Sequence, residues 1–221
     1  MLYALLSDIH ANLPALKASL KEISKFKVKK ILIAGDTCGK GPFPFEVISI
    51  LREIDAIIIK GNSDKKFLST KLSANKLTKK EFELVKFLSI APDTLWVDDK
   101  IFICHGSPLN VTDYIYPSIT RESLLAKLDG LKKPEVLCCG HSHIPFVKEI
   151  NGVLIVNSGS VGKPIDGDPR GSFAVFELNE KDKRGEIVRF NYDIAFLVEA
   201  LKKKNSSKKV IDSYLKGIKN G

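Results

Sequence analysis

The chain has 221 residues, 44% of them hydrophobic, and a formal net charge of +9. This length and composition predict one domain with a substantial hydrophobic core. No stretch of the sequence approaches the roughly 18–20 consecutive apolar residues that a membrane-spanning helix requires. We therefore expect a protein with no membrane partner.

The apolar N-terminus has no basic lead-in and no small-residue cleavage site, so we interpret it as a buried first strand and not as a signal peptide. Four cysteines lie in or just after apolar runs: Cys38, Cys104, Cys138 and Cys139. Their positions predict buried, reduced thiols, which are usual in proteins of a reducing compartment. We expect a cytoplasmic location.

The positive charge is concentrated in lysines near the chain end and around the first predicted helix. Residues 201–221 contain seven lysines and one acid, which leaves a charge of +6 in this segment alone. No arginine-rich or aromatic-interleaved stretch accompanies these lysines, so a solvated Lys-rich surface is the favoured interpretation. Nucleic acid is not an expected partner. The sequence makes no prediction about the oligomeric state.

Strands and helices are expected to alternate in the first 90 residues. Leu2–Leu6 is a continuous apolar run typical of a strand buried on both faces. Leucines from Leu13 to Leu20 recur at helical spacing with Pro14 near the start. The remaining expected elements are the strands Ile31–Ala34 and Ile54–Ile59 and the helices Phe45–Leu51, Lys65–Leu72 and Thr78–Ile90, the last opened by a capping box of Thr78 and Glu81.

Short strands dominate the second half, with one helix at Arg121–Leu128 and two at the end, Ile194–Lys203 and Lys208–Lys219. Asn151-Gly152 is a strong two-residue hairpin signal. The expected strands are Thr94–Val97, Ile101–Cys104, Val136–Cys139, Phe146–Ile150, Val153–Val156, Phe173–Leu178 and Ile187–Asn191. This pattern predicts an α/β fold of mixed sheets flanked by helices. We expect a single domain over residues 1–221, with a Lys-rich helical C-terminal segment from about residue 193.

Five of the predicted strands end in a short polar cluster. Ligands of α/β folds gather outside the carboxyl ends of strands, so these clusters are expected to converge on one site. Neighbouring glycines suit loops in which the backbone closely approaches a metal or a phosphate. The clusters are Ser7-Asp8-Ile9-His10, Gly35-Asp36, Gly61-Asn62-Ser63-Asp64, His105-Gly106 and Gly140-His141-Ser142-His143.

All four histidines of the chain lie in these clusters, beside Asp8, Asp36 and Asn62. Mixed imidazole and carboxylate ligands suit Mn, Fe, Ni or Zn, and they argue against an all-oxygen calcium or magnesium site. No cysteine accompanies them, which argues against a structural zinc–thiolate site. The sequence therefore predicts a metal centre.

In this order the five clusters resemble the signature of the calcineurin-like metallophosphoesterase superfamily, which reads D-x-H, G-D, G-N-[H/C]-[D/E], H and G-H-x-H. The resemblance covers roughly residues 1–178. The segment from Asn157 to Pro164, with Asp166 to Arg170 and His105-Gly106-Ser107-Pro108, resembles the compact YfcE-type and diadenosine-tetraphosphatase-like branch. The glycine- and proline-rich segment is either a plain turn or a loop at the rim of the active site.

The resemblance implies a sandwich of two mixed sheets and two divalent metal ions, manganese first and Fe, Ni or Zn as alternatives. Asp8, His10 and His143 would bind one ion. Asn62, His105 and His141 would bind the other, and Asp36 would bridge them. Among these, Asp36, Asn62 and His105 would also be catalytic, as a metal-activated hydroxide attacks a small phosphorylated substrate in line.

Three further residues are expected to contact the substrate or support the site. Arg170 is available to a phosphate, and Asn12 either orients a neighbouring ligand or caps the first helix. Ser63 replaces a histidine that many relatives use to protonate the leaving oxygen. Because serine has no usable proton for this role near neutral pH, we expect a preference for good leaving groups.

Two other functions fit the same pattern. A nuclease of the superfamily would show steeply salt-dependent DNA binding. A non-catalytic scaffold or interaction protein of this fold, as in a retromer subunit, is the alternative from a different functional class. Retention of all seven proposed ligands favours catalysis.

Overall fold

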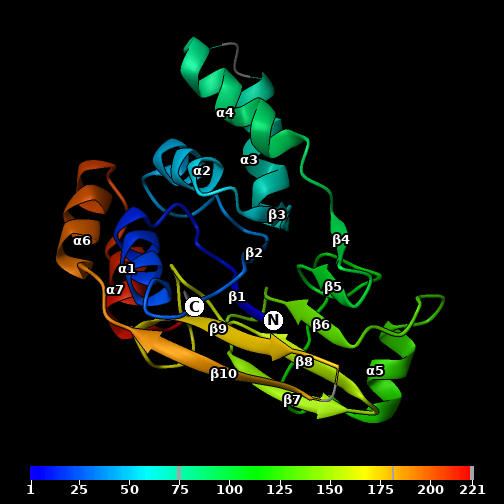
Figure 1. Cartoon of the computed structure of the whole chain (residues 1–221). Helices are drawn as coiled ribbons and strands as arrows, with labels where there is room; N and C mark the ends of the chain where they lie inside the picture. The colour runs from blue at the N-terminus through cyan, green and yellow to red at the C-terminus, as the bar shows by residue number, and fades with distance from the viewer. Residues whose placement is uncertain (74–75, 181, 220–221) are drawn as a thin grey trace.

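The computed structural model describes residues 1–73, 76–180 and 182–219 (Figure 1). Within this part of the chain, ten strands form two five-stranded sheets packed face to face. The first sheet has the order β10-β9-β1-β2-β3 and the second has the order β4-β5-β6-β8-β7. Both sheets mix parallel and antiparallel pairs, as the sequence predicted.

The first sheet is parallel at its centre, where β1 pairs with β2 and β2 with β3, and antiparallel where β1 meets β9 and β9 meets β10. Its strands are β1 (Leu2–Leu6), β2 (Lys30–Ala34), β3 (Ile57–Ile59), β9 (Gly171–Leu178) and β10 (Lys183–Phe190). The parallel strands end at the same edge, and this edge carries three of the predicted polar clusters.

The second sheet has the parallel strands β5, β6 and β8 between antiparallel edge strands. Its strands are β4 (Thr94–Val97), β5 (Ile101–Cys104), β6 (Val136–Cys139), β7 (Phe146–Ile150) and β8 (Val153–Asn157). The predicted Asn151-Gly152 hairpin joins β7 to β8, and both residues have positive φ, 52° and 73°.

One hydrophobic layer lies between the two sheets, and a further layer lies between each sheet and the helices that cover it. Tyr3 and Leu5 of β1 face the core between the sheets, whereas Ala4 and Leu6 face the helices on the other side. This alternation follows from the period of two of a strand buried on both faces. The helices are α1 (Leu13–Ile23), α2 (Pro44–Glu53), α3 (Asn62–Ser73), α4 (Lys79–Ser89), α5 (Arg121–Lys127), α6 (Ile194–Lys203) and α7 (Lys208–Lys216).

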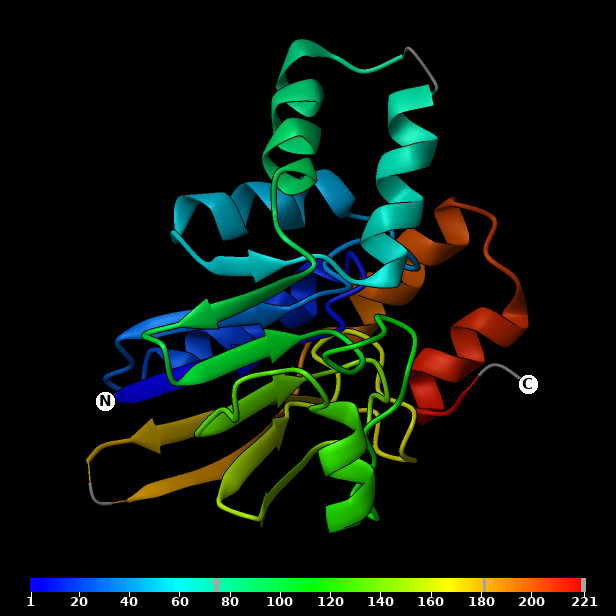
Figure 2. The same cartoon turned by 90° about the vertical axis from the view of Figure 1, so that its right-hand side faces the viewer.

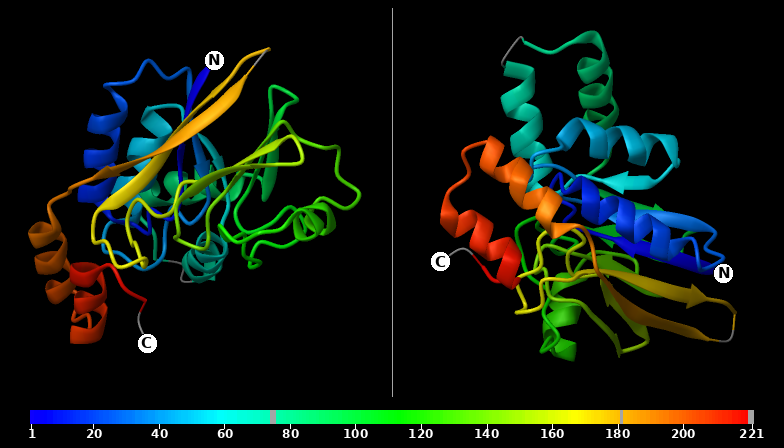
Figure 3. Two further views of the ribbon diagram at one scale, coloured as in Figure 1. Left: turned by 90° about the horizontal axis from the view of Figure 1, so that it is seen from below. Right: turned by 90° about the vertical axis from the view of Figure 1, so that its left-hand side faces the viewer.

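The helices cover both outer faces of the sandwich. Helices α1, α2 and α4 contribute to the core outside the first sheet, and α5 packs outside the second (Figure 1). Helices α3 and α4 form a projecting pair (Figure 2). Helices α6 and α7 lie beside α1 at one end of the molecule (Figure 3). None of the described helices is both long and apolar enough to cross a membrane.

Several boundaries differ from the sequence-based expectations. Strand β3 begins at Ile57 and not at Ile54, because Ile54 caps α2 through a hydrogen bond from its N–H to the carbonyl of Ile50. Helix α3 begins at Asn62, three residues before the predicted start. Helix α7 ends at Lys216 and not at Lys219, because Gly217 adopts the left-handed conformation of a C-cap.

Strand β9 begins two residues earlier than expected, because Gly171 and Ser172 pair with Phe190 and Arg189. Strand β10 begins four residues earlier than expected, because its charged residues still pair. Lys183 and Arg184 lie opposite Leu178 and Glu177 in the ladder, with alternate side chains exposed. Charged residues that alternate along an edge strand leave no continuous apolar run, so the sequence pattern does not indicate this part of the strand. The capping box of Thr78 and Glu81 at the start of α4 is confirmed, and all four cysteines are buried and free.

The core between the sheets should control the stability of the fold. Leu5 is fully buried there, so Leu5→Ala should lower the free energy of unfolding by about 2–5 kcal/mol in urea titrations. The control Leu109→Ala removes an exposed leucine and should change it by less than about 0.5 kcal/mol. An equal effect of the two substitutions would contradict the assignment of Leu5 to the shared core.

Candidate metal centre

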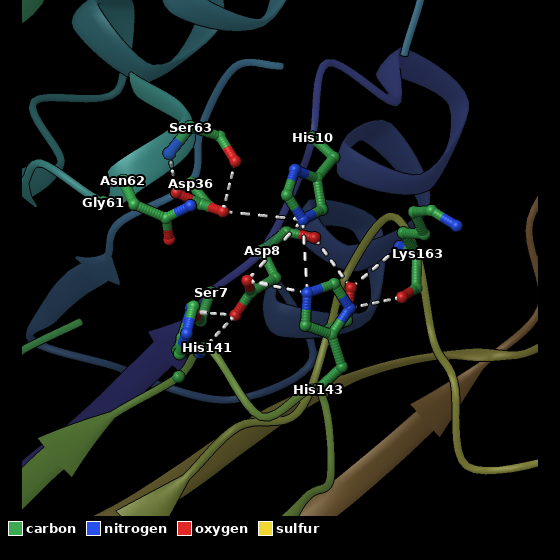
Figure 4. Close-up of polar contacts among 12 residues, drawn as sticks. Ser7, Asp8, His10, Asp36, Gly61, Asn62, Ser63, His141, His143 and Lys163 are labelled. Carbon is green, nitrogen blue, oxygen red and sulfur yellow. Dashed lines mark hydrogen bonds and ion pairs between the residues drawn. The ribbon is translucent and has the colours of Figure 1, made fainter. Parts of the chain in front are cut away.

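The five polar clusters converge at one edge of the sandwich, where strands of both sheets end. Figure 4 labels residues of four of these clusters. Asp8 and His10 follow β1, and Asp36 follows β2. Asn62 opens α3, after the two residues that follow β3. His105 follows β5, while His141 and His143 follow β6. The structure therefore brings together all seven residues that the sequence singled out as ligands.

Asp8, His10 and His143 form a first group that could hold a metal ion. Nε2 of His143 lies 3.0 Å from Oδ1 of Asp8, and Nε2 of His10 lies 3.6 Å from the same oxygen. The two Nε2 atoms are 3.2 Å apart. Ligand atoms that share one ion at about 2.1 Å are themselves roughly 3 Å apart, so this spacing suits a common cation.

The second group surrounds Nε2 of His105. This atom lies 3.4 Å from Oδ1 of Asp36, 3.2 Å from Oδ1 of Asn62 and 3.1 Å from Nδ1 of His141. Asp8 is also close enough to share this group with Asp36 and His105. Oδ2 of Asp36 lies 3.7 Å from Nε2 of His10 in the first group, so the Asp36 carboxylate faces both groups.

Hydrogen bonds to backbone carbonyls orient two of the imidazoles. Nδ1 of His105 lies 2.7 Å from the carbonyl oxygen of Ala34, and Nδ1 of His143 contacts that of Lys163. Because a carbonyl only accepts, both Nδ1 atoms must carry hydrogen. In the neutral rings the Nε2 lone pairs then point into the site, as metal binding requires.

Unsatisfied buried atoms show that the residues fit a cation. Oδ1 of Asp8 is buried and accepts no well-directed hydrogen bond from the described residues, although Nε2 of His143 lies near it. Nδ1 of His10 is likewise buried without a hydrogen-bond partner in the described part of the chain. Buried polar atoms are normally paired, and a bound cation would satisfy the Asp8 oxygen.

The backbone at the site is held in an uncommon conformation. Five of the seven proposed ligands have φ in the left-handed region: Asp8 (53°), His10 (49°), Asp36 (52°), His141 (63°) and His143 (55°). Asp and His tolerate this region better than most residues, yet it is sparsely populated outside glycine. Such strain clusters at functional sites because the surrounding structure must impose it.

Two glycines allow the strand ends to approach each other. A Cβ on Gly140 would lie 1.8 Å from Oγ of Ser7, and a Cβ on Gly61 would lie 2.1 Å from Oδ1 of Asp36. Any larger residue at either position would push a carboxylate-bearing loop away. The glycines therefore set the spacing of the two groups.

Residues 1–181 match the model of the calcineurin-like phosphoesterase superfamily domain. The chain belongs to the calcineurin-like phosphoesterase superfamily. The family expected from the sequence motifs is thereby confirmed, and the helices α6 and α7 lie beyond the matched region.

Three relatives place this member of the superfamily among known proteins. The chain is 32% identical to the uncharacterized protein MJ0912 of Methanocaldococcus jannaschii, over 90% of this chain and 91% of that one. It is 25% identical to the phosphodiesterase YfcE of Escherichia coli, over 74% and 80%. The structure of a metallophosphoesterase from Sphaerobacter thermophilus, 25% identical, matches 99% of both chains with a TM-score of 0.81. This likeness confirms the predicted fold class.

The charges of this calcineurin-like site favour a bound cation. Burial opposes ionisation of Asp8, but His143, His105 and His10 hold the pKa of its carboxyl well below the usual range. Burial, together with His143, keeps the pKa of His10 well below its ordinary value. The ring of His10 is therefore neutral at physiological pH, which is the form that binds metals.

In the second group the pKa of one imidazole, that of His105, is raised and not lowered. Burial disfavours a charge on His105, but Asp8 and Asp36 outweigh it and raise the pKa of this imidazole. Burial and His105 lower the pKa of His141. Two carboxylates that attract a proton to His105 will also attract a divalent cation, and cation binding would displace that proton.

Asp64 organises the loops that carry Asp36 and Asn62, although the sequence singled it out only as part of a motif. Its buried carboxylate accepts hydrogen bonds from the N–H groups of Thr37 (3.2 Å), Cys38 (2.8 Å) and Gly61 (3.0 Å). Burial and the nearby Asp36 raise the pKa of Asp64 to about 7. Asp64 thus fixes the ends of β2 and β3 relative to each other.

The three expected substrate contacts lie in different surroundings. Ser63 is at the site, where its Oγ donates to Oδ2 of Asp36 (2.6 Å) and its N–H donates to Oδ1 (2.8 Å). Asn12 caps α1 by accepting from the N–H of Ala15, and its Nδ2 donates to the carbonyl of Gly162. The capping role is the one that the structure shows for Asn12.

Arg170 is not among the residues that line the cleft at the metal centre. Its exposed guanidinium is paired with Asp168, 2.7 Å from Oδ2. The phosphate contact expected of Arg170 stays a prediction.

Lys163 was missed as a functional residue by sequence reasoning, because its role depends on its backbone and on a distant helix. Its carbonyl orients His143, and its Nζ donates to Oγ of Ser213 (3.1 Å) and lies 5.0 Å from the ring centre of Tyr214 on α7. Burial, together with Lys40, lowers the pKa of Lys163 to about 8. Helix α7 thus supports a metal-centre loop.

The Asp64 contacts predict a coupled loss of stability and metal binding. Asp64→Asn leaves one acceptor oxygen for three buried N–H donors, so the free energy of unfolding should fall by about 1–3 kcal/mol in urea titrations. The affinity for Mn²⁺ in calorimetric titrations should fall about tenfold or more. Asp129→Asn, at an exposed position, should change neither quantity; an Asp64→Asn protein equal to this control would refute the role of Asp64.

Proposed function

We propose that the chain is a phosphoesterase that binds two divalent cations and hydrolyses small phosphomonoesters, phosphodiesters or nucleoside polyphosphates. The observation that carries this proposal is the placement of Asp36, whose Oδ1 faces His105 and whose Oδ2 faces His10. A carboxylate between two imidazole-lined groups is suited to bridge two ions. Manganese is the proposed metal, with Fe, Ni or Zn as alternatives.

The proposed ligands follow from the two groups. Asp8, His10 and His143 would hold one ion, while Asn62, His105 and His141 would hold the other, with Asp36 shared. When bound, two such ions lower the pKa of a water to generate the nucleophile and neutralise charge on the phosphoryl oxygens. Carbonyl-anchored rings and a buried Asp8 keep these ligands preorganised before substrate arrives.

Membership of the superfamily and the phosphodiesterase relative support hydrolysis of a phosphoester. The cleft beside the metal centre has a volume of about 430 Å³ and is lined in part by Asp36, Asn62, His141 and His143. Three lysines, Lys40, Lys163 and Lys219, also line it. A cleft of this size with cationic side chains suits a small, anionic substrate.

The leaving-group oxygen has no histidine donor beyond the metal-site rings. All four histidines of the chain belong to the two groups, and Ser63 donates its hydroxyl to Asp36. No histidine is therefore left over to protonate a poor leaving group. The proposed enzyme should act best on esters whose leaving groups depart as stable anions.

The bridging position of Asp36 is testable by a nearly isosteric substitution. With Mn²⁺, the wild-type protein should hydrolyse bis(p-nitrophenyl) phosphate, and Asp36→Asn should lower kcat/KM by at least about 10²-fold because one ion loses its shared ligand. Asp129→Asn should leave the rate unchanged. Absence of turnover in the wild type with Mn, Fe, Ni and Zn would favour the non-catalytic scaffold role instead.

The missing proton donor predicts a steep dependence on the leaving group. Across a series of aryl methyl phosphodiesters, log kcat/KM should fall steeply as the pKa of the leaving phenol rises. Ser63→His should flatten this dependence, with the largest gain for the poorest leaving group. Ser63→Ala is the matched control, and it should keep the wild-type slope. A shallow slope in the wild type would contradict the proposal.

A further inference from the structure

Two exposed tyrosines lie in the cleft beside the metal centre and have no part in binding the cations. Tyr114 and Tyr116 belong to the loop between β5 and α5, and each is 42% exposed. Both line the cleft together with Asn62 and His143. Large aromatic side chains exposed in a polar cleft are informative, because burial of their rings would be favourable.

The tyrosines continue a column of rings that begins at a proposed metal ligand. The ring of Tyr114 stacks on His141 with centroids 4.5 Å apart and an interplanar angle of 27°. Tyr116 stacks on Tyr114 at 5.4 Å and 9°. In the described part of the chain Tyr116 does not stack on His141, so it forms the outer end of the column. The column leads from the reaction site into the cleft.

The loop holds this column rigidly. Ile115, between the two tyrosines, is fully buried in the core outside the second sheet. Asp113 is paired with Lys127 of α5, and Nζ of Lys148 donates to the carbonyl oxygens of residues 117 and 119. The loop therefore presents its rings without a large further loss of conformational entropy, as a binding surface should.

We propose that Tyr114 and Tyr116 form a stacking platform for the base of a nucleoside phosphoester. Every base offers a flat π-face, and stacking on exposed tyrosines is a common mode of nucleotide recognition. The positive charges of Lys40 and Lys219 in the same cleft suit the negatively charged phosphate of a nucleotide. The proposal rests on the phosphoesterase function above and names its substrate class.

Tyr116 is the residue to change, because Tyr114 also contacts His141 and its removal would disturb a proposed ligand. Two diesters with the same leaving group separate stacking from chemistry: thymidine 5′-(p-nitrophenyl) phosphate and methyl p-nitrophenyl phosphate. With the Mn²⁺-loaded wild type, kcat/KM should be at least about tenfold higher for the thymidine ester. Tyr116→Ala should lower this ratio about tenfold, mainly by raising KM for the thymidine ester.

Two control variants define the expected result. Tyr116→Phe keeps the ring and should keep the wild-type ratio. Phe82→Ala removes an exposed aromatic ring from α4, outside the cleft, and should leave both rates unchanged. If Tyr116→Ala leaves the ratio of the two rates unchanged, whether or not both rates fall, the platform is refuted and the rings serve to support His141.

A binding measurement separates this proposal from the proposed function. If p-nitrophenolate is released from neither diester, the phosphoesterase proposal fails. In calorimetric titrations, thymidine 5′-monophosphate should still bind at least about tenfold more tightly than 2-deoxyribose 5-phosphate, and Tyr116→Ala should abolish this difference. Equal affinities of the two ligands for the wild type would overturn the platform.

Discussion

The buried carboxylate of Asp8 is the point at which the two sheets and the metal centre meet. Its Oδ2 accepts hydrogen bonds from Oγ of Ser7 (2.5 Å) and from the N–H of His141 (2.9 Å). Because Asp8 follows β1 and His141 follows β6, this oxygen ties together the ends of strands from both sheets. Oδ1 is left to face His10 and His143. Burying a carboxylate is costly unless its charge is compensated, and a cation at this oxygen would provide that compensation.

The same constraint explains the unusual backbone of the site. The ligand side chains reach a common point only if the chain turns sharply after each strand, and five of the proposed ligands therefore adopt positive φ. Each such residue costs free energy that packing elsewhere in the fold must offset. The fully buried strands and the shared core between the sheets supply a rigid frame for this purpose. Because the ligand side chains are already in position, little rearrangement of the protein is needed when a cation binds.

Much of the fold was predictable because buried parallel strands are continuous apolar runs and each ends in polar residues. The residues proposed as ligands came from the same pattern. Ile54 was assigned to β3 because apolar character alone does not distinguish a helix end from a strand. The ion pair of Arg170 with Asp168 is a contact that the sequence pattern does not indicate. The support from Lys163 and α7, and the ring column that ends at Tyr116, depend on contacts between distant segments, which no local periodicity encodes.

We propose that these strand ends bind two cations that share Asp36. Equilibrium dialysis of the purified chain against Mn²⁺, followed by elemental analysis of protein-bound metal, tests it most directly. Two Mn²⁺ ions per chain are expected, because two groups of imidazole and carboxylate ligands face one bridging carboxylate. A folded chain that saturates at one ion, or that retains none in the presence of Mn, Fe, Ni or Zn, would contradict it.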